Sequence, residues 1–395
     1  MRDEKLVELA ERYDTPLYVT EAERIVEKYR LLKNAFREKT RIYYSCKANT
    51  NLSILRLLLR EGSFVDAVSI GEVLACLKAG FQKDRMMFTG TGVRDDELKF
   101  LAERGIMVNI DSFSELRRLC AIAERPMNLS FRLNPGVGAG HSEKTITGNR
   151  ESKFGMEKEE LERAVVFAME RGHSIRAIQC HIGSGILNEE PFIKAAEVLN
   201  ETADGIEERT GAALEFLDIG GGFGVPYAGE KELNVEGLAL RLSGMIDRPL
   251  AIEPGRYIVA DSTVLLTRVN TIKSNGGKSF AEVDAGFNTL IRPAMYGSYH
   301  NIKLVAAERA GKERYDIVGP LCESGDFLAR DREMPQLEEG DLLAVENAGA
   351  YGFSMSSNYN SRPRAAEILI IGGEIRVMRE RESYEDIFAG QRVVL

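Results

Sequence analysis

Short apolar or β-branched segments alternate with amphipathic stretches along the first two thirds of the chain, and this alternation constrains the fold more than any other feature. The eight candidate strands begin at Arg41, Phe64, Met86, Met107, Met127, Ile178, Phe216 and Pro249. Helical patterns lie between them, for example at residues 52–62, 69–80, 95–105 and 112–124. Helix-start and helix-stop signals accompany two of these patterns, namely Asp111-Ser112 before a helix and Gly62 or Gly80 after one. Eight strands alternating with helices over about 250 residues predict a closed (β/α)8 barrel of the TIM type. A doubly wound open sheet is the alternative, which the strand count disfavours.

The pattern changes after about residue 262, where short strands follow one another with little helical period. These segments start at Ser279, Arg314, Gly340 and Ala365. They predict a β-rich C-terminal domain resembling a β-barrel or sandwich. The first residues, with the apolar run PLYV at Pro16, fit as a further strand of that domain. We therefore expect a barrel over residues 23–261 and a β-rich domain from residues 1–22 and 262–395.

Composition excludes several classes of protein. The 52 Lys and Arg against 61 Asp and Glu give a net charge of −9, which argues against nucleic acid as the main partner. No run of about 20 apolar residues predicts a membrane span, and the charged N-terminus is unlike a secretory signal. Five widely spaced cysteines fit neither a disulfide framework nor a zinc motif, so we expect a cytoplasmic enzyme without a metal.

In a (β/α)8 barrel the active site lies at the carboxyl ends of the strands. Lys47 ends a hydrophobic strand there, and a desolvated lysine is a good nucleophile towards a carbonyl group. The run Gly220–Gly222 is not a dinucleotide fingerprint, because Val225 stands where a third glycine is needed. Its backbone N–H groups suit a phosphate monoester, although a tight turn is the alternative.

The other polar residues at these strand ends each have a structural and a functional interpretation. His181 is either a packed residue or a ring that lies against a cofactor, and the nearby Ser184 offers a hydroxyl group to phosphate. Glu253 and Arg256 form either an internal ion pair or part of the site. Asp66 is more easily explained as a cap or an ion-pair partner.

The second domain adds three motifs with chemically useful side chains. The first carries Arg292 and Tyr296, the second Cys322 and Glu323, and the third Tyr351. The thiol of Cys322 could donate a proton, although a merely buried thiol is the more common case.

Seven motifs in sequence order carry a resemblance to a known family: YYSCKAN, HIGSG, LDIGGGFG, EPGRYIVA, IRPAMYGSYH, GPLCESGD and AGAYGFSMSSNYN. They resemble the motif set of the diaminopimelate decarboxylase family. That family belongs to the fold-type III pyridoxal phosphate enzymes, with alanine racemase and the ornithine and arginine decarboxylases as relatives. The resemblance runs from about Pro16 to the closing RERESYEDIF, and so covers nearly the whole chain.

The resemblance implies a role for each candidate residue towards pyridoxal 5′-phosphate. Lys47 binds the cofactor covalently, His181 stacks on its ring and Glu253 pairs with the ring nitrogen. The phosphate is held by Ser184, Gly220, Gly221, Gly222, Gly255 and Arg256. Asp66 and Tyr351 complete the set of cofactor-binding residues.

The resemblance also implies a substrate and an assembly. Lys47, His181 and Cys322 are the catalytic residues, with Cys322 as the acid. The substrate is bound by Arg256, Arg292, Tyr296, Glu323 and Tyr351. Racemases of the family carry an arginine in place of Glu253, so a decarboxylase is favoured. A distal carboxylate clamp favours meso-diaminopimelate over ornithine, with L-lysine as the product. The family's Cys-Glu loop enters the partner's site, which implies a homodimer.

Two departures and two alternatives accompany this interpretation. Ser45-Cys46 precedes Lys47, where the family usually has Ala-Val or a similar pair, and residues 141–148 differ from the family's usual loop. One alternative is another decarboxylase of the family, acting on ornithine, arginine or a carrier-bound amino acid. The other is a non-catalytic pyridoxal phosphate-binding relative, which the presence of both Lys47 and Cys322 disfavours.

Overall fold

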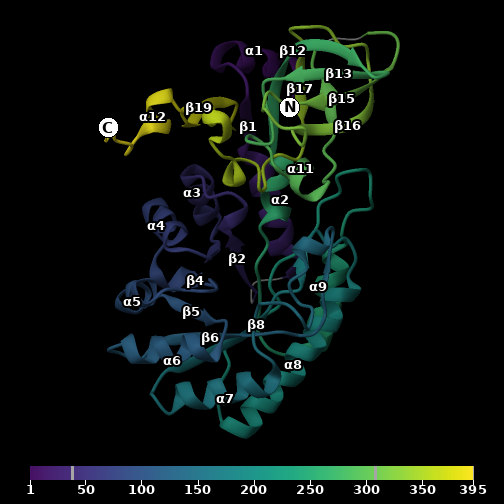
Figure 1. The fold of residues 1–395 in the computed structure, drawn as a ribbon. Helices are drawn as coiled ribbons and strands as arrows, with labels where there is room; N and C mark the ends of the chain where they lie inside the picture. Colours follow the sequence, from purple (N-terminus) through teal and green to yellow (C-terminus); the bar gives the residue numbers. More distant parts are fainter. Residues whose placement is uncertain (37–39, 307–308, 395) are drawn as a thin grey trace. The chain divides into compact units, whose positions relative to one another are not determined.

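A computed structural model describes residues 1–36, 40–306 and 309–394 (Figure 1). The chain divides into two compact units, and the first contains the N-terminal segment and the C-terminal third. Its ranges are Met1–Ile25, Tyr227–Glu230 and Ile258–Leu395. The second unit contains Val26–Pro226 and Lys231–Tyr257. No helix in the described ranges is both long and apolar enough to cross a membrane.

The second unit is built on a closed barrel of parallel strands. In barrel order these are β2 (Arg41–Ser45), β3 (Phe64–Ala67), β4 (Met86–Phe88), β5 (Met107–Ile110), β6 (Asn128–Leu133), β8 (Ser174–Cys180), β10 (Phe216–Asp218) and β11 (Leu250–Ile252). The ring closes where β11 pairs with β2, with Ala251 opposite Arg41. These are the eight strands expected from the sequence, so the barrel is confirmed and the open-sheet alternative is wrong.

One strand starts earlier than its sequence pattern indicated. β8 begins at Ser174, whereas the apolar run was placed from Ile178. Ser174 is exposed and Arg176 is half-buried, so the first half of β8 carries polar side chains. Because the first residues of β8 are partly exposed to solvent, they lack the continuous apolar run by which a buried strand is recognised in a sequence.

Helices lie around the outside of these strands (Figure 1). They are α2 (Ala22–Phe36), α3 (Leu52–Glu61), α4 (Ile70–Ala79), α5 (Asp95–Arg104), α6 (Phe113–Ile122), α7 (Lys158–Met169), α8 (Glu190–Thr210) and α9 (Val235–Met245). The expected end signals are confirmed. The Ser112 side chain accepts a hydrogen bond from the Glu115 N–H, and Gly62 and Gly80 end α3 and α4 in the left-handed conformation.

A small two-stranded sheet, β7 (Ala139–Gly140) with β9 (Gly183–Ser184), lies beyond the ends of β6 and β8. Inside the barrel a buried apolar cluster packs Tyr43, Met87, Ala177, Phe216 and Ala251 together. The ring centroids of Tyr43 and Phe216 are 6.2 Å apart in a stacked arrangement. This packed cluster separates the polar side chains at the carboxyl ends of the strands from the rest of the barrel interior.

The first unit contains one mixed sheet of nine strands. They are β1 (Leu17–Glu21), β12 (Thr263–Asn275), β13 (Lys278–Val283), β14 (Ile302–Leu304), β15 (Glu313–Val318), β16 (Phe327–Met334), β17 (Leu342–Val345), β18 (Ala366–Ile371) and β19 (Glu374–Arg379). Its helices are α1 (Asp3–Tyr13), α11 (Arg292–Tyr296) and α12 (Tyr384–Phe388), and α10 (Arg256–Val259) spans the boundary of the two units. The predicted β-rich domain is thereby confirmed.

The N-terminal strand joins this sheet, as the sequence indicated. β1 pairs antiparallel with β12 and parallel with β18. Leu17 and Val19 pack with Leu6 and Leu9 of α1, whereas Tyr18 packs in a separate cluster on the other face. Side chains alternate along a strand, so β1 can be buried on both faces of the sheet.

Candidate active site

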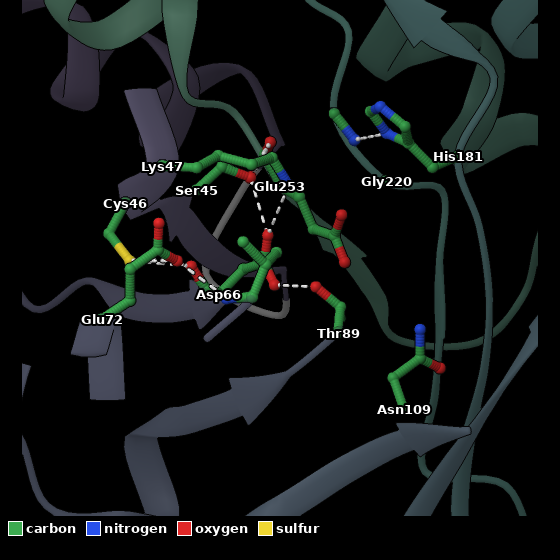
Figure 2. A network of polar contacts seen from close by, with 12 residues as sticks. Ser45, Cys46, Lys47, Asp66, Glu72, Thr89, Asn109, His181, Gly220 and Glu253 are labelled. Carbon is green, nitrogen blue, oxygen red and sulfur yellow. Dashed lines mark hydrogen bonds and ion pairs between the residues drawn. The ribbon is translucent and has the colours of Figure 1, made fainter. Parts of the chain in front are cut away.

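The strand β2 delivers Lys47 to the mouth of the barrel. β2 ends at Ser45, and a single turn of 3-10 helix, Cys46–Ala48, carries the lysine. The Lys47 side chain is half-buried, and its Nζ lies 3.1 Å from Oδ2 of Asp66 (Figure 2). The ammonium group is therefore held by a carboxylate from the neighbouring strand β3.

Asp66 is the centre of a network of polar contacts. It is fully buried and accepts hydrogen bonds from Ser45 Oγ at 2.9 Å and from Thr89 Oγ1 (Figure 2). A buried carboxylate is tolerated only when its oxygens have partners, and here three donors supply them. The structure thus gives Asp66 the ion-pair role that was one of its two interpretations, with Lys47 as the partner.

His181 follows β8 and its ring is neutral. The Gly221 N–H donates to His181 Nδ1 at 3.0 Å, so this nitrogen carries a lone pair. Burial, and then the positive charges of Lys47 and Arg132, hold the pKa of His181 well below its ordinary value. A neutral imidazole with Nδ1 fixed by the backbone keeps its ring in one orientation.

The glycine run is packed so closely that no side chain fits. A Cβ on Gly220 would lie 2.3 Å from the carbonyl oxygen of Cys180, and one on Gly221 would lie 2.2 Å from that of Glu253. Gly220 and Gly222 also have positive φ angles, of 72° and 102°. Only glycine meets both conditions. The run therefore brings bare backbone next to the ends of β8 and β11.

Two further candidate residues contact one another directly. Arg256 is buried, and its Nη2 donates to Ser184 Oγ at 3.0 Å. Gly255 precedes Arg256, and a Cβ there would lie 3.0 Å from the Ser45 side chain. The turn after β11 is thus packed against the end of β2.

Glu253 is a buried carboxyl group that is fixed by an amide chain. Its Oε1 accepts from Gln179 Nε2 at 3.1 Å, and Gln179 Oε1 accepts from Asn109 Nδ2 at 3.2 Å. Burial, followed by the negative charges of Asp218 and Asp66, raises the pKa of Glu253 well above its ordinary value. The carboxyl group is therefore oriented from three different strands.

These groups surround a cavity of about 300 Å³ at the barrel mouth. The structure brings together Lys47, His181 and Glu253 in its lining. The remaining lining residues are Val68, Thr89, Thr91, Arg132, Thr147, Lys153, Phe154 and Gln179. The sequence reasoning missed Arg132 and Gln179 as site residues. Their signal was a long polar side chain between apolar residues of a predicted strand, in LSFRLN and in IQCH.

In the first unit, Arg292 is held by a separate group of side chains. The arginine is 1% exposed, and its Nη1 donates to His300 Nε2 at 2.8 Å. His300 Nδ1 in turn lies 2.8 Å from the Glu346 carbonyl oxygen, so Nδ1 carries the proton. The Tyr227 ring packs 4.6 Å from the guanidinium carbon. The sequence reasoning missed His300, which ends the same motif as Arg292.

The loop with Cys322 and Glu323 is exposed. The Cys322 N–H donates to Asn360 Oδ1 at 2.9 Å, and Tyr359 Oη donates to Glu323 Oε2 at 2.9 Å. The Cys322 thiol is accessible to solvent, so its interpretation as a buried packing residue is wrong.

The two candidate tyrosines of this unit, Tyr296 and Tyr351, are both half-buried. Tyr296 is the last residue of α11, four residues after Arg292. Tyr351 has a φ of 57°, which is uncommon for a residue with a side chain.

The sequence and the structure of this chain are similar to those of known proteins. The family described as "Pyridoxal-dependent decarboxylase, pyridoxal binding domain" matches residues 22–260. The diaminopimelate decarboxylase of Methanothermobacter thermautotrophicus is 51% identical, over 98% of this chain and 94% of its own length. That of Archaeoglobus fulgidus is 42% identical, over 98% and 96%. The crystal structure of diaminopimelate decarboxylase from Helicobacter pylori complexed with L-lysine superposes with a TM-score of 0.93, at 37% identity, and covers 97% of this chain and 98% of that one.

Proposed function

The chain belongs to the pyridoxal-dependent decarboxylases and, within them, to the diaminopimelate decarboxylase family, and on this premise we propose that it converts meso-2,6-diaminopimelate into L-lysine and CO2 as the last step of lysine biosynthesis. The observation that carries the proposal is the 51% identity to a diaminopimelate decarboxylase over 98% of the chain. This match spans both the barrel residues and the polar residues of the first unit, so it concerns the cofactor and the substrate alike.

The residues at the barrel mouth fit pyridoxal 5′-phosphate. A lysine amine at a strand end suits its aldehyde group, and Lys47 provides it. No side chain protrudes from the glycine run Gly220–Gly222, as the approach of a phosphate group to the backbone requires, and the Gly220 and Gly221 N–H groups themselves donate to Asp218 and His181. The Arg256–Ser184 pair adds a cation and a hydroxyl group. These three features support the set of residues assigned to the cofactor.

When bound, the cofactor withdraws electrons from the α-carbon of an amino acid, which is what the loss of CO2 requires. The chain's own residues set up this chemistry. Asp66 holds Lys47 Nζ in one position. Glu253 is oriented by Gln179 towards the cavity, where it would keep the ring nitrogen protonated. The neutral ring of His181 offers a flat face without adding a positive charge.

The residues of the first unit would select the substrate. The planar guanidinium group of Arg292 is fixed by His300 and has the geometry that suits a carboxylate, and Tyr296 lies on the same helix, α11. Glu323 would bind the distal ammonium group. Cys322, which is exposed, would donate the proton that replaces the lost carboxylate. Ornithine lacks the distal carboxylate, and so would leave the buried guanidinium of Arg292 without its anion.

A homodimer follows from the same resemblance. In this arrangement the Cys322-Glu323 loop of one chain completes the barrel site of its partner. Exposure of both residues supports this part of the proposal, because side chains that act on another subunit have to be accessible. We also place the protein in the cytoplasm, as expected for a biosynthetic enzyme whose cysteines are free in the structure.

A substrate panel tests the proposal. CO2 release is measured from meso-diaminopimelate, L-lysine, L-ornithine and L-arginine, each with added pyridoxal 5′-phosphate. We expect turnover with meso-diaminopimelate and at most traces with the other three. Turnover with ornithine or arginine alone would favour the other decarboxylases of the family. No CO2 from any substrate would favour a non-catalytic relative.

A further inference from the structure

Two buried carboxyl groups come together in the barrel, and only one of them has been given a role. Asp218 ends β10 and is fully buried, and Glu253 directly follows β11 and is 3% exposed. β10 and β11 are neighbouring strands, with Asp218 opposite Ala251. The Gly220 carbonyl, two residues after Asp218, accepts from the Glu253 N–H at 2.8 Å, so the two acidic residues lie side by side at the ends of adjacent strands.

The hydrogen bonds of Asp218 are incomplete if both groups are ionised. Its Oδ1 accepts from the Gly220 N–H at 2.8 Å. Its Oδ2 is fully buried and has no hydrogen-bond donor within the described ranges. A carboxylate has no hydrogen to donate, so an ionised Glu253 cannot satisfy this oxygen. Two ionised groups would also bury two like charges side by side, which is costly.

One proton removes both difficulties. When Oδ2 of Asp218 carries it, the O–H can donate to the Glu253 carboxylate, and the pair has a single negative charge. The two carboxylates of aspartic proteases share a proton for the same electrostatic reason. The pair's single negative charge can lie on either carboxyl group, and the proposed role towards the cofactor requires it on Glu253.

Charged and titratable groups face the pair from several strands. They are Lys47 and Arg132, which favour ionisation, Asp66, which opposes it, and the buried side chains of Cys180 and Tyr43. Burial outweighs the two cations. It raises the pKa of Asp218 to about 7 and that of Glu253 well above its ordinary value. The pair therefore holds a proton near neutral pH.

The same carboxyl group is tied to the glycine run. The Gly220 N–H donates to Asp218 Oδ1, and the Gly220 carbonyl accepts from the Glu253 N–H at 2.8 Å. We propose that Asp218 is a positioning residue, which shares one proton with Glu253 and fixes this carboxylate against the first residue of the glycine run. The cofactor side of this role rests on the proposed function, whereas the shared proton does not.

The variant Asp218→Asn tests the shared proton in the full-length chain without cofactor. An asparagine keeps an oxygen for the Gly220 N–H and replaces the O–H by an N–H donor that cannot ionise. In the natural protein the folded pair holds a proton that an ordinary unfolded Asp has lost above about pH 4. Unfolding near pH 6 should therefore release about one proton more in the natural protein than in Asp218→Asn. The measurement is the pH slope of the unfolding free energy in urea between pH 5 and 7.

A control and a second variant make the result decisive. Asp247→Asn removes an exposed carboxylate before β11 and should leave the slope unchanged. An unchanged slope in Asp218→Asn would overturn the shared proton. If this variant does not fold, Glu253→Gln removes the same proton from the other side, since glutamine can donate to Asp218. If the pH slope of the unfolding free energy in Glu253→Gln equalled that of the natural protein, the proposal would be overturned.

The positioning role has a separate readout, the dissociation constant of pyridoxal 5′-phosphate. Asp218→Ala loses both the Gly220 contact and the donor, and should bind the cofactor about tenfold more weakly or worse. Asp218→Asn should stay much closer to the natural protein. Equal weakening in both variants would overturn the positioning role. Failure to release CO2 from meso-diaminopimelate refutes the proposed function alone, whereas an unchanged proton slope refutes the carboxyl pair alone.

Discussion

At the scale of single residues, the candidate site residues are held in position by one or two neighbouring side chains. Lys47, the proposed nucleophile, is held by Asp66, and the Glu253 carboxyl group is oriented by Gln179. Arg292 is a guanidinium fixed by His300. In each case the residue expected from the sequence is held by a second residue that was not assigned to holding it. The second residue fixes the orientation of the first. Its substitution should therefore weaken the binding of substrate or cofactor while the reacting group itself stays in place.

His300 provides a prediction of this kind. His300→Ala frees the Nη1 donor of Arg292 from its fixed acceptor, so the fork loses its orientation. We expect the KM for meso-diaminopimelate to rise about tenfold, equivalent to about 1.4 kcal/mol, with a much smaller change in kcat. Steady-state CO2 release gives both constants.

Two matched variants accompany His300→Ala. His300→Gln keeps an acceptor on a long side chain and should recover part of the KM. His173→Ala removes another buried histidine, which accepts from the Met127 N–H in the barrel unit, and should leave the KM unchanged. A fall in kcat at constant KM in His300→Ala would contradict the assigned role.

At the scale of elements, the carboxyl ends of the strands and the starts of the helices carry the site. A polar residue lies within one residue of the end of each of β2, β3, β8, β10 and β11, namely Ser45, Asp66, His181, Asp218 and Glu253. The barrel fixes the spacing of these ends, because each strand is paired with its two neighbours. Loops that leave such ends can therefore hold backbone groups in positions where no side chain fits.

The glycine run gives a prediction at this scale. Gly221→Ala places a Cβ 2.2 Å from the Glu253 carbonyl oxygen, so β11 and the glycine run have to separate. We expect a loss of about 1–3 kcal/mol in the free energy of unfolding and weaker binding of pyridoxal 5′-phosphate. Gly244→Ala is the matched control, because its Cβ meets nothing within 4 Å in α9. It should stabilise the protein by about 0.5–1 kcal/mol. Equal stability of the two variants would contradict the packing argument.

The start of α6 gives a prediction on pH. Glu115 is buried, and burial followed by the charge of Asp111 raises its pKa to about 8. A carboxyl group with a raised pKa destabilises the folded state as the pH rises from about 4 through that value. Glu115→Gln should therefore gain stability relative to the natural protein between pH 5 and 9, by at least about 1.4 kcal/mol, the equivalent of one pKa unit.

Urea unfolding at several pH values measures this gain. The matched control is Glu97→Gln at the same position of α5, where the half-buried glutamate accepts from the Arg94 N–H. That variant should show the pH dependence of the natural protein. A parallel pH profile in Glu115→Gln would show that Glu115 is ionised in the folded state and would refute the prediction.

At the scale of the whole molecule, the candidate residues are divided between two compact units. Lys47, His181 and Glu253 belong to the barrel, whereas Arg292 and Cys322 belong to the unit with the nine-stranded sheet. The proposed decarboxylation uses residues of both groups, and therefore needs both units. The proposed dimer meets this need by pairing the barrel of one chain with the exposed Cys322 loop of its partner.

Mixed dimers test this arrangement. Lys47→Ala and Cys322→Ala should each be nearly inactive, because each defect affects both sites of its own dimer. After joint refolding, half of the dimers are mixed, and one of their two sites has both residues intact. Activity should therefore return to about a quarter of the natural value. Lys47→Ala mixed with Glu253→Gln is the control, since both defects lie in the barrel and no intact site can form. No recovery in the first mixture would count against the shared site.

The sequence by itself determined the features that repeat or that depend on neighbouring residues. The alternation of strands and helices predicted the barrel, the Ser112 and glycine signals predicted helix ends, and the strand-end motifs predicted that Lys47, Glu253 and the glycine run follow barrel strands. These follow from hydrophobic periodicity and from local backbone preferences, both of which act within a few residues.

The tertiary structure alone decided which groups meet. Gln179 reaches Glu253 across 74 residues of sequence. The contact of Gly220 with Asp218 is local, but the approach of Asp218 to Glu253 is not. Such contacts depend on the closure of the barrel and on the burial that follows from it. Burial then changes which protonation state is stable, because the low polarity of the interior penalises every unpaired charge. No pattern of residues along the chain records that penalty.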